Sequence, residues 1–210
     1  MGYKYKFKYL KDRSLVKIKG KNILECFGRV RLSKIKISGE NNILLIEKGA
    51  RINKSKISIN GNNNKILIRK NCDLNNLNII MHNKDGIIEI DENTTCGKTQ
   101  IVSLEPYAIK IGKNCMISYD VEIRNTDSHK ILDLNTNKWI NKGKEVLIGD
   151  NVWIATRTII LKGSKILNGS IIGACSIVSS EIKENSIAVG SPAKITKGNV
   201  YWNRESVIPK

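Results

Sequence analysis

The chain has 210 residues and a formal net charge of +17, with 36 Lys and Arg against 19 Asp and Glu. This length suits one ordinary domain that buries a core without disulfides or a metal, and no stretch approaches the roughly 18 apolar residues that a membrane-spanning helix needs. Lys, Asn and Ile are enriched together and the basic residues form no recognised binding motif, so we expect a compositional bias and no nucleic-acid partner. An anionic ligand would still be attracted by such a field.

Residues 1–10 alternate aromatic and lysine side chains, with Tyr3, Tyr5, Phe7 and Tyr9 on one side of an extended strand. We interpret this strand as a cap for the first turn of the fold or as a subunit contact; a contact with a membrane surface is the alternative. The segment lacks the apolar run of a signal peptide. The chain has five cysteines, an odd number, and no CxxC motif, which favours a reducing cytoplasm over a disulfide framework. A peripheral position at the inner face of the membrane is compatible with this.

The first half of the chain is built from a loose internal repeat. Matching segments begin with an isoleucine, at Ile46, Ile68, Ile90, Ile111 and Ile148. Small or apolar residues stand at the fourth and sixth offsets, namely Ala50, Cys72, Thr94, Cys115 and Val152, then Ile52, Leu74, Cys96, Ile117 and Ile154. Gly or Asn occupies the third offset, at Gly49, Asn71, Asn93, Asn114 and Asn151, where we expect a bend with positive φ. The cysteines in these columns are expected to be small core residues and not nucleophiles.

From Ile148 onwards the chain repeats in sixes. An aliphatic residue recurs every six positions, at Ile148, Ile154, Ile160, Ile166, Ile172 and Val178. A second inward column follows four positions later and is mostly small, at Val152, Thr158, Ser164, Ser170, Ser176 and Ile182. Short strands joined by brief bends satisfy both columns, and three such strands, one per hexapeptide, close a triangular coil. Each coil buries its face only against its neighbours, as in solenoids.

The fold class predicted from these repeats is all-β, a parallel β-helix. We expect N-terminal cap strands over residues 1–40, irregular coils over 41–108 and regular hexapeptide coils over 109–187. The sixfold order fails between Ile123 and Glu145, which predicts an extruded loop over 129–147, and long ordered loops are commonly functional. Residues 188–210 form a short tail, for which a helix is one option.

Several motifs resemble those of the hexapeptide-repeat acyltransferases. They are IGDNVWIATRTIILKG at 148–163 and AVGSPAKI at 188–195. The segments at 121–131, 140–154 and 190–202 are more narrowly similar to bacterial O-acetyltransferases that modify surface and capsular polysaccharides. The resemblance implies a left-handed winding of the helix, acetyl-CoA as the acetyl donor, and no metal.

The resemblance also implies a catalytic histidine. His129, in the motif VEIRNTDSHKI, stands where the family carries its general base, and an imidazole is suited to accept a proton near neutral pH. Asp127 lies two residues earlier and could orient the imidazole; a solvated bend carboxylate is the alternative. The chain has only one other histidine, His82, and we expect it to be structural.

The expected cofactor contacts lie downstream. The resemblance implies that Trp153 flanks the acetyl-CoA channel next to the histidine, that the backbone at Thr156 and Ala174 holds the pantetheine arm, and that Lys194 meets a CoA phosphate. Three hexapeptides separate Thr156 from Ala174, so these two residues should stack one coil above the other. The sequence departs from the family at Ala155, commonly glycine, and at Ser179-Ser180, where relatives often carry a lysine.

The predicted function is transfer of an acetyl group from acetyl-CoA to a sugar hydroxyl of a bacterial surface polysaccharide, with a sialic acid polymer as the leading candidate. The expected assembly is a homotrimer that binds CoA between subunits. Two alternatives stay open: an acetyltransferase of the same fold acting on a free sugar, antibiotic or amino acid, and a non-catalytic β-solenoid scaffold. A zinc-dependent relative of this fold would need three histidines.

Overall fold

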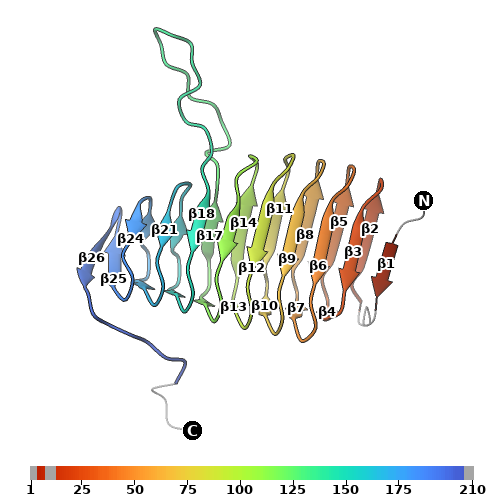
Figure 1. The fold of residues 1–210 in the computed structure, drawn as a ribbon, viewed down its shortest axis with the longest axis horizontal. Helices are drawn as coiled ribbons and strands as arrows, with labels where there is room; N and C mark the ends of the chain where they lie inside the picture. The colour runs from red at the N-terminus through yellow and green to blue at the C-terminus, as the bar shows by residue number, and fades with distance from the viewer. Residues whose placement is uncertain (1–3, 8–12, 206–210) are drawn as a thin grey trace.

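The computed structural model of the protein describes residues 4–7 and 13–205, with side chains over 13–205. All regular secondary structure in this part of the chain is β-strand, and it contains no helix. Three sheets run along the long axis and enclose a single core, so the all-β parallel β-helix predicted from the repeats is confirmed (Figure 1). We name the sheets A, B and C.

The strands of each sheet are given in chain order. Sheet A contains β1 (Lys4–Phe7), β3 (Ile23–Cys26), β6 (Ile43–Ile46), β9 (Lys65–Ile68), β12 (Ile87–Ile90), β15 (Ile109–Ile111), β18 (Val146–Ile148), β21 (Lys165–Ile166) and β24 (Glu181–Ile182). Sheet B contains β2 (Leu15–Lys19), β5 (Lys34–Ser38), β8 (Lys56–Asn60), β11 (Asn78–Met81), β14 (Thr99–Ser103), β17 (Val121–Arg124), β20 (Ile159–Ile160) and β23 (Ile177–Val178). Sheet C contains β4 (Arg29–Arg31), β7 (Arg51–Asn53), β10 (Asp73–Asn75), β13 (Thr95–Cys96), β16 (Met116–Ile117), β19 (Trp153–Ile154), β22 (Ile171–Ile172), β25 (Ile187–Gly190) and β26 (Ala193–Lys197).

Each coil passes through sheets B, A and C in that order, and neighbouring coils pair in parallel. In the first half of the chain Ile57 lies between Ile35 and Ile79 in sheet B, which sets the register of the longer, irregular coils. In the second half Trp153 pairs with Ile171, which gives the shorter coil of three hexapeptides. The sheets continue without a break past residues 40 and 108.

The two inward columns form the core. The sixfold aliphatic column from Ile148 to Val178 is buried throughout, as is the second column from Val152 to Ile182. Cys72, Cys96 and Cys115 are buried in the upstream columns, and burial raises the pKa of each thiol, to about 12, 12 and 11. Their burial in the inward columns confirms the prediction that they are core residues.

The bend predicted at the third offset is present at every predicted position. Gly49 has φ of 82°, and Asn71, Asn93, Asn114 and Asn151 have φ between 54° and 59°. Asn tolerates this left-handed conformation better than other residues with a side chain. The repeated Gly or Asn therefore fixes where the chain turns from sheet A into sheet C.

A ladder of buried asparagines lines the corner between sheets B and A. Asn42 donates through Nδ2 to Asn22 Oδ1 at 2.9 Å, and Asn64 donates in the same way to Asn42 Oδ1 at 3.0 Å. The next backbone amide along the ladder, that of Gly86, donates to Asn64 Oδ1 at 3.0 Å. Asn125 lies at the same corner, in the coil from which the long loop leaves, and is also fully buried. Asparagine side chains therefore supply hydrogen-bond partners to the polar groups at this corner, where the hydrogen bonds between strands are interrupted.

Both ends of the solenoid carry extra strands. β1 pairs in parallel with β3 and adds one strand to the N-terminal end of sheet A; the rest of residues 1–10 lies outside the described residues. At the other end β26 pairs antiparallel with β25. The helix considered for the tail is not formed in its described part, because residues 193–197 complete the edge of sheet C and residues 198–205 are irregular.

Candidate active site

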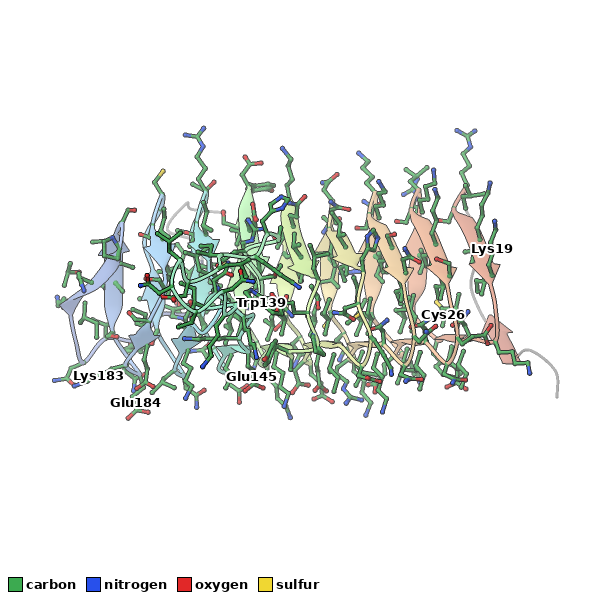
Figure 2. All side chains as sticks on the ribbon, turned by 90° about the horizontal axis from the view of Figure 1, so that it is seen from above. Lys19, Cys26, Trp139, Glu145, Lys183 and Glu184 are labelled. Carbon is green, nitrogen blue, oxygen red and sulfur yellow. The ribbon has the colours of Figure 1, made fainter. Side chains whose placement is uncertain are left out.

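A long loop leaves the solenoid at the corner between sheets B and A, after β17 and before β18. It is the only large excursion from the coils in the described chain (Figure 1). Glu105 joins the two ends of the loop, because its Oε1 accepts from Thr126 Oγ1 at 2.9 Å and its Oε2 accepts from the Gly143 amide at 2.7 Å. Viewed from above, Trp139 of the loop lies over the coils about midway along the axis (Figure 2). The loop is thus fixed at its base and projects from the fold.

Asn141 organises the base of the loop. Its Oδ1 accepts from the Ile131 amide at 2.6 Å and from Trp139 Nε1 at 2.8 Å. Its Nδ2 donates to Asp127 Oδ2 and to the His129 carbonyl, each at 2.9 Å. One amide side chain therefore fixes the backbone of His129 to the returning arm of the loop.

Asp127 contacts a lysine from the next coil. Lys162 Nζ donates to Asp127 Oδ2 and also to the Asn141 carbonyl at 2.7 Å. The hydrogen bond from Lys162 holds the pKa of the Asp127 carboxyl below its ordinary value of 3.8, with a smaller contribution from Asn141. This carboxylate is charged at neutral pH and anchors the segment that leads to His129.

The His129 side chain is exposed at the start of the loop. Neither of its ring nitrogens has a hydrogen-bond partner within residues 13–205. The structure does not bring the Asp127 carboxylate to the imidazole, because that carboxylate points to Lys162 and Asn141. The ring is therefore open to a ligand or to another chain. His82 differs, since its Nε2 lies 3.3 Å from Ser58 Oγ on the outer face of sheet B.

Trp153 lies on the opposite side of the same coil, on the outer face of sheet C. In sheet C, Trp153 pairs with Met116 of β16 on one side and with Ile171 of β22 on the other. The indole packs against Trp202 of the tail, with ring centroids 6.0 Å apart. Since a corner between sheets B and A faces away from sheet C, a single chain does not bring His129 and Trp153 together.

The other expected cofactor residues lie on the side of Trp153. Thr156 follows β19 at the corner between sheets C and B, where its hydroxyl donates to the Tyr119 carbonyl at 2.8 Å. Its carbonyl accepts from the Cys175 amide at 2.9 Å, so Thr156 and Ala174 stack in adjacent coils. Lys194 is exposed on β26 at the edge of sheet C. Trp153, Thr156, Ala174 and Lys194 therefore share one side of the chain, and His129 is on another.

A shallow groove of about 600 Å³ runs along the outer face of sheet C and ends at Trp153. Its lining mixes polar and apolar side chains, with Asn75, Thr95 and Ser118 from successive coils, and includes the exposed ring of Tyr119. The tail crosses sheet C near this groove, where Arg204 donates to the Cys115 carbonyl at 2.7 Å. The groove can hold an extended polar ligand beside Trp153.

Sequence reasoning missed Lys162, Asn141, Glu105, Trp202 and Arg204. The contacts of Lys162 and Glu105 cross between coils, and sequence spacing does not reveal which side chains of adjacent coils meet outside the columns. Trp202 lies in the tail motif GSPAKITKGNVYW, so its conspicuous tryptophan was a usable signal. It is 8% exposed and donates through Nε1 to the Asn151 carbonyl at 2.7 Å.

Within the described residues no group of three or more His, Cys, Asp or Glu is arranged to hold a metal ion. In the same part of the chain no helix is long and apolar enough to span a membrane.

Comparison with known proteins agrees with this architecture. The model of the bacterial transferase hexapeptide family (six repeats) matches residues 145–180. The crystal structure of the polysialic acid O-acetyltransferase OatWY superposes with a TM-score of 0.89 at 33% identity, covering 91% of this chain and 92% of that one. The chain belongs to the hexapeptide-repeat acyltransferase family. Within that family the polysialic acid specific acetyltransferase NeuO also superposes, with a TM-score of 0.81 at 28% identity over 93% of this chain and 84% of that one.

The sequence match to a curated relative covers a smaller part of the chain than the structural match does. The polysialic acid O-acetyltransferase of Neisseria meningitidis is 37% identical over 119 residues, which is 56% of this chain. The matched segment spans about half the length of that curated relative, 55%.

Proposed function

We propose that the protein transfers the acetyl group of acetyl-CoA to a hydroxyl of an acidic bacterial surface polysaccharide, with polysialic acid as the leading acceptor. One observation carries the proposal. The similarity to the OatWY structure extends over nine-tenths of both chains, and so includes most of the first hundred residues as well as hexapeptide coils. Acetyl-CoA as donor would place the reaction in the cytoplasm.

His129 acts as the general base in this proposal. The acceptor oxygen attacks the thioester carbonyl, its proton passes to the imidazole, the carbon–sulfur bond breaks, and the imidazolium returns the proton to the departing CoA sulfur. A sugar hydroxyl is a weak nucleophile near neutral pH, and a positioned base contributes roughly 10²–10⁴-fold to such a step. The exposed imidazole, which has no hydrogen-bond partner within residues 13–205, has the free nitrogen that this role needs.

A second copy of the chain completes the site. Leu134 at the loop is 97% exposed, and Ile131, Leu132 and Ile140 are also exposed, which is a large apolar surface for a loop in solution. Packing this loop on a neighbouring copy would bury it and bring one copy's His129 towards the next copy's Trp153. Threefold closure of that heterologous contact gives a homotrimer.

The donor side of the site is formed by Trp153, Thr156, Ala174 and Lys194. The indole flanks the thioester, and the backbone at Thr156 and Ala174 receives the pantetheine arm, since the side chains in this column are small. Lys194 is exposed at the edge of sheet C and supplies positive charge for a CoA phosphate. No metal is required, because the base and the thioester provide the chemistry.

The test is an assay of thiol release from acetyl-CoA over a panel of acceptors: oligosialic acid, neutral capsular oligosaccharides, free sugars and serine. We expect turnover with oligosialic acid. Turnover confined to free sugars or serine would refute the polysaccharide assignment and retain the acetyltransferase. Absence of turnover with every acceptor, together with no binding of acetyl-CoA by calorimetry, would refute the acetyltransferase itself.

A further inference from the structure

The positive charge of the chain is concentrated at one end of the solenoid. Residues 13–70 contain 15 Lys and Arg but only three Asp and Glu, whereas residues 71–210 contain 17 Lys and Arg and 15 Asp and Glu. A uniform compositional bias would spread the charge along the chain. Residues 71–210, which carry His129 and Trp153, are nearly neutral, so a uniform bias does not account for the basic coils.

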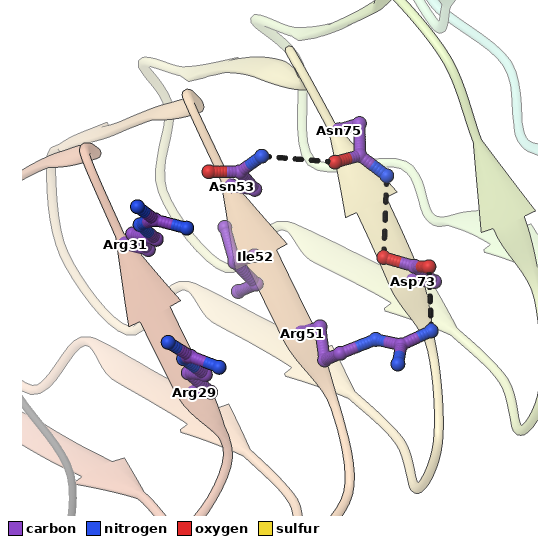
Figure 3. Close-up of a pocket in the computed structure, with 7 residues that line it drawn as sticks. All are labelled: Arg29, Arg31, Arg51, Ile52, Asn53, Asp73 and Asn75. Carbon is purple, nitrogen blue, oxygen red and sulfur yellow. Dashed lines mark hydrogen bonds and ion pairs between the residues drawn. The ribbon is translucent and has the colours of Figure 1, made fainter.

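Three arginines of these coils gather on the outer face of sheet C. Arg29 and Arg31 lie on β4 and Arg51 lies on the adjacent β7, around a hollow of about 210 Å³ (Figure 3). Among the described residues that line the hollow, the acidic one is Asp73, and Arg51 Nη2 already contacts its Oδ2 at 2.7 Å. The Arg31 guanidinium has no carboxylate partner within residues 13–205. Arg31 therefore contributes positive charge to the hollow that no carboxylate of residues 13–205 offsets.

Lysines on sheet B extend the positive surface around the corner. Lys17 pairs in register with Lys36, and Lys34 with Lys56, so like charges stand on neighbouring strands about 4.8 Å apart. Directly opposed like charges destabilise a sheet. None of these four lysines has an ion pair in the described part of the chain. Only two residues separate β4 from β5, so the arginines and lysines flank one edge of the solenoid.

The basic hollow is continuous with the groove that ends at Trp153. Asn53, Asp73 and Asn75 line both. Five strand spacings separate β4 from β19 in sheet C, a length of about 24 Å. A ligand must be an extended polymer to contact the arginines and Trp153 at once, and a free sugar is too short.

We propose that Arg29, Arg31 and Arg51, together with the lysine pairs of sheet B, form a docking site for the carboxylates of an acidic polysaccharide, remote from the reacting hydroxyl. This rests on the proposed function and specifies how its acceptor is held. Guanidinium groups bind carboxylates with charge-assisted hydrogen bonds. The site raises the local concentration of acceptor strand near Trp153 and selects polymers over short oligomers.

The experiment compares the R29Q/R31Q/R51Q variant with the K110Q/K165Q/K183Q variant, which removes the same charge from exposed positions away from these arginines. Kinetics are measured with polysialic acid and with trisialic acid as acceptors. We expect the arginine variant to raise KM for the polymer roughly tenfold, because three exposed charge contacts are lost. Its KM for acetyl-CoA and its rate with trisialic acid should match the control. An unchanged KM for the polymer would overturn the proposal.

A second measurement separates this proposal from the proposed reaction. Binding of fluorescent polysialic acid is followed in the H129A background, alone and with R31Q/K36Q/K56Q, which leaves the Arg51–Asp73 ion pair intact. We expect the affinity to fall with these three substitutions, even if no acceptor is ever acetylated. Unchanged affinity, or tighter binding of double-stranded DNA than of polysialic acid at 0.15 M salt, would overturn the docking site while leaving the acetyltransferase in place.

Discussion

Lys162 reaches across one coil to contact Asp127, two residues before the exposed His129. The same ammonium group holds the Asn141 carbonyl, so the lysine ties both arms of the loop to the solenoid. His129 is therefore held through its backbone, and its imidazole remains open. Asp127 is a positioning residue in this arrangement, since its carboxylate faces the lysine.

The contact between Lys162 and Asp127 should depend on pH. Because Lys162 lowers the pKa of Asp127, the contact is present above the unfolded pKa of about 3.8 and is lost as the pH falls through the lower, folded pKa. Emission from Trp139, whose Nε1 is bound to Asn141, should change in this acidic range before the far-ultraviolet circular dichroism of the coils changes. The D127N variant should lack this step. Coincident changes in both signals would contradict the local anchor.

Asp127→Asn should also lower kcat about tenfold, because a displaced base still transfers protons but from a poorer position. The effect on KM for acetyl-CoA should be small. Steady-state kinetics checks this, with K162M as the partner variant. Similar losses in both variants and in the double variant are expected, since either change breaks the same contact. Additive losses would indicate separate roles.

His129→Ala should reduce the transfer rate by roughly 10²–10⁴-fold with little change in melting temperature, because the side chain is exposed and contributes little packing. His82→Ala is the matched control: it removes a contact with Ser58 on sheet B and should leave the rate unchanged. An H129A enzyme that keeps more than about a tenth of the rate would exclude the general base.

Mixing H129A with W153A, each of which we expect to lose most activity because it lacks one half of the site, tests the shared site. His129 and Trp153 lie on opposite sides of one coil, so H129A and W153A should complement each other in mixed trimers. Random assembly at equal amounts leaves intact about a quarter of the sites that pair one copy's histidine with the next copy's tryptophan. The assay follows co-refolded or co-expressed subunits. Light scattering that gives a monomer would contradict the assembly, and so would the absence of recovered activity.

We expect substitution of Asn42, which is remote from the site, to lower the stability of the fold. The N42A variant leaves the Asn64 amide and the Gly61 carbonyl without their partners at a buried corner, and Asn22 Oδ1 keeps only the Asn42 backbone amide as a donor. We expect a loss of about 3 kcal/mol in the free energy of unfolding, measured by chemical denaturation. Asn60→Ala, at an exposed position on sheet B, is the control and should cost less than about 0.5 kcal/mol.

The sequence predicts the coils well because their periodicity has a direct physical cause. Ile148, Ile154 and Ile160 must face inwards if every coil is closed by three short strands, and Asn151 must bend where few residues tolerate positive φ. The site is harder to predict, because it depends on contacts between coils. Nothing in the spacing pairs Lys162 with Asp127.

The remaining misses have separate physical reasons. The buried role of Asn42 was hidden, since asparagine in a loop usually indicates a turn. The tail was open to a helical interpretation because it is mostly polar and lies beyond the sixfold columns that indicate strands. The uneven distribution of charge could be counted from the sequence alone, but its meaning depends on knowing that Arg31 and Arg51 share a face.

The tail has a consequence for how the molecule is completed during synthesis. Contacts between neighbouring coils join residues close in sequence, so the coils can stack one by one as the chain leaves the ribosome. Arg204 instead contacts Thr95 Oγ1, 109 residues earlier, and Trp202 covers Trp153. These contacts of Trp202 and Arg204 form only after residue 204 has emerged from the ribosome. Until then the face of sheet C beside Trp153 stays uncovered, so this face is the last part of the solenoid to be completed.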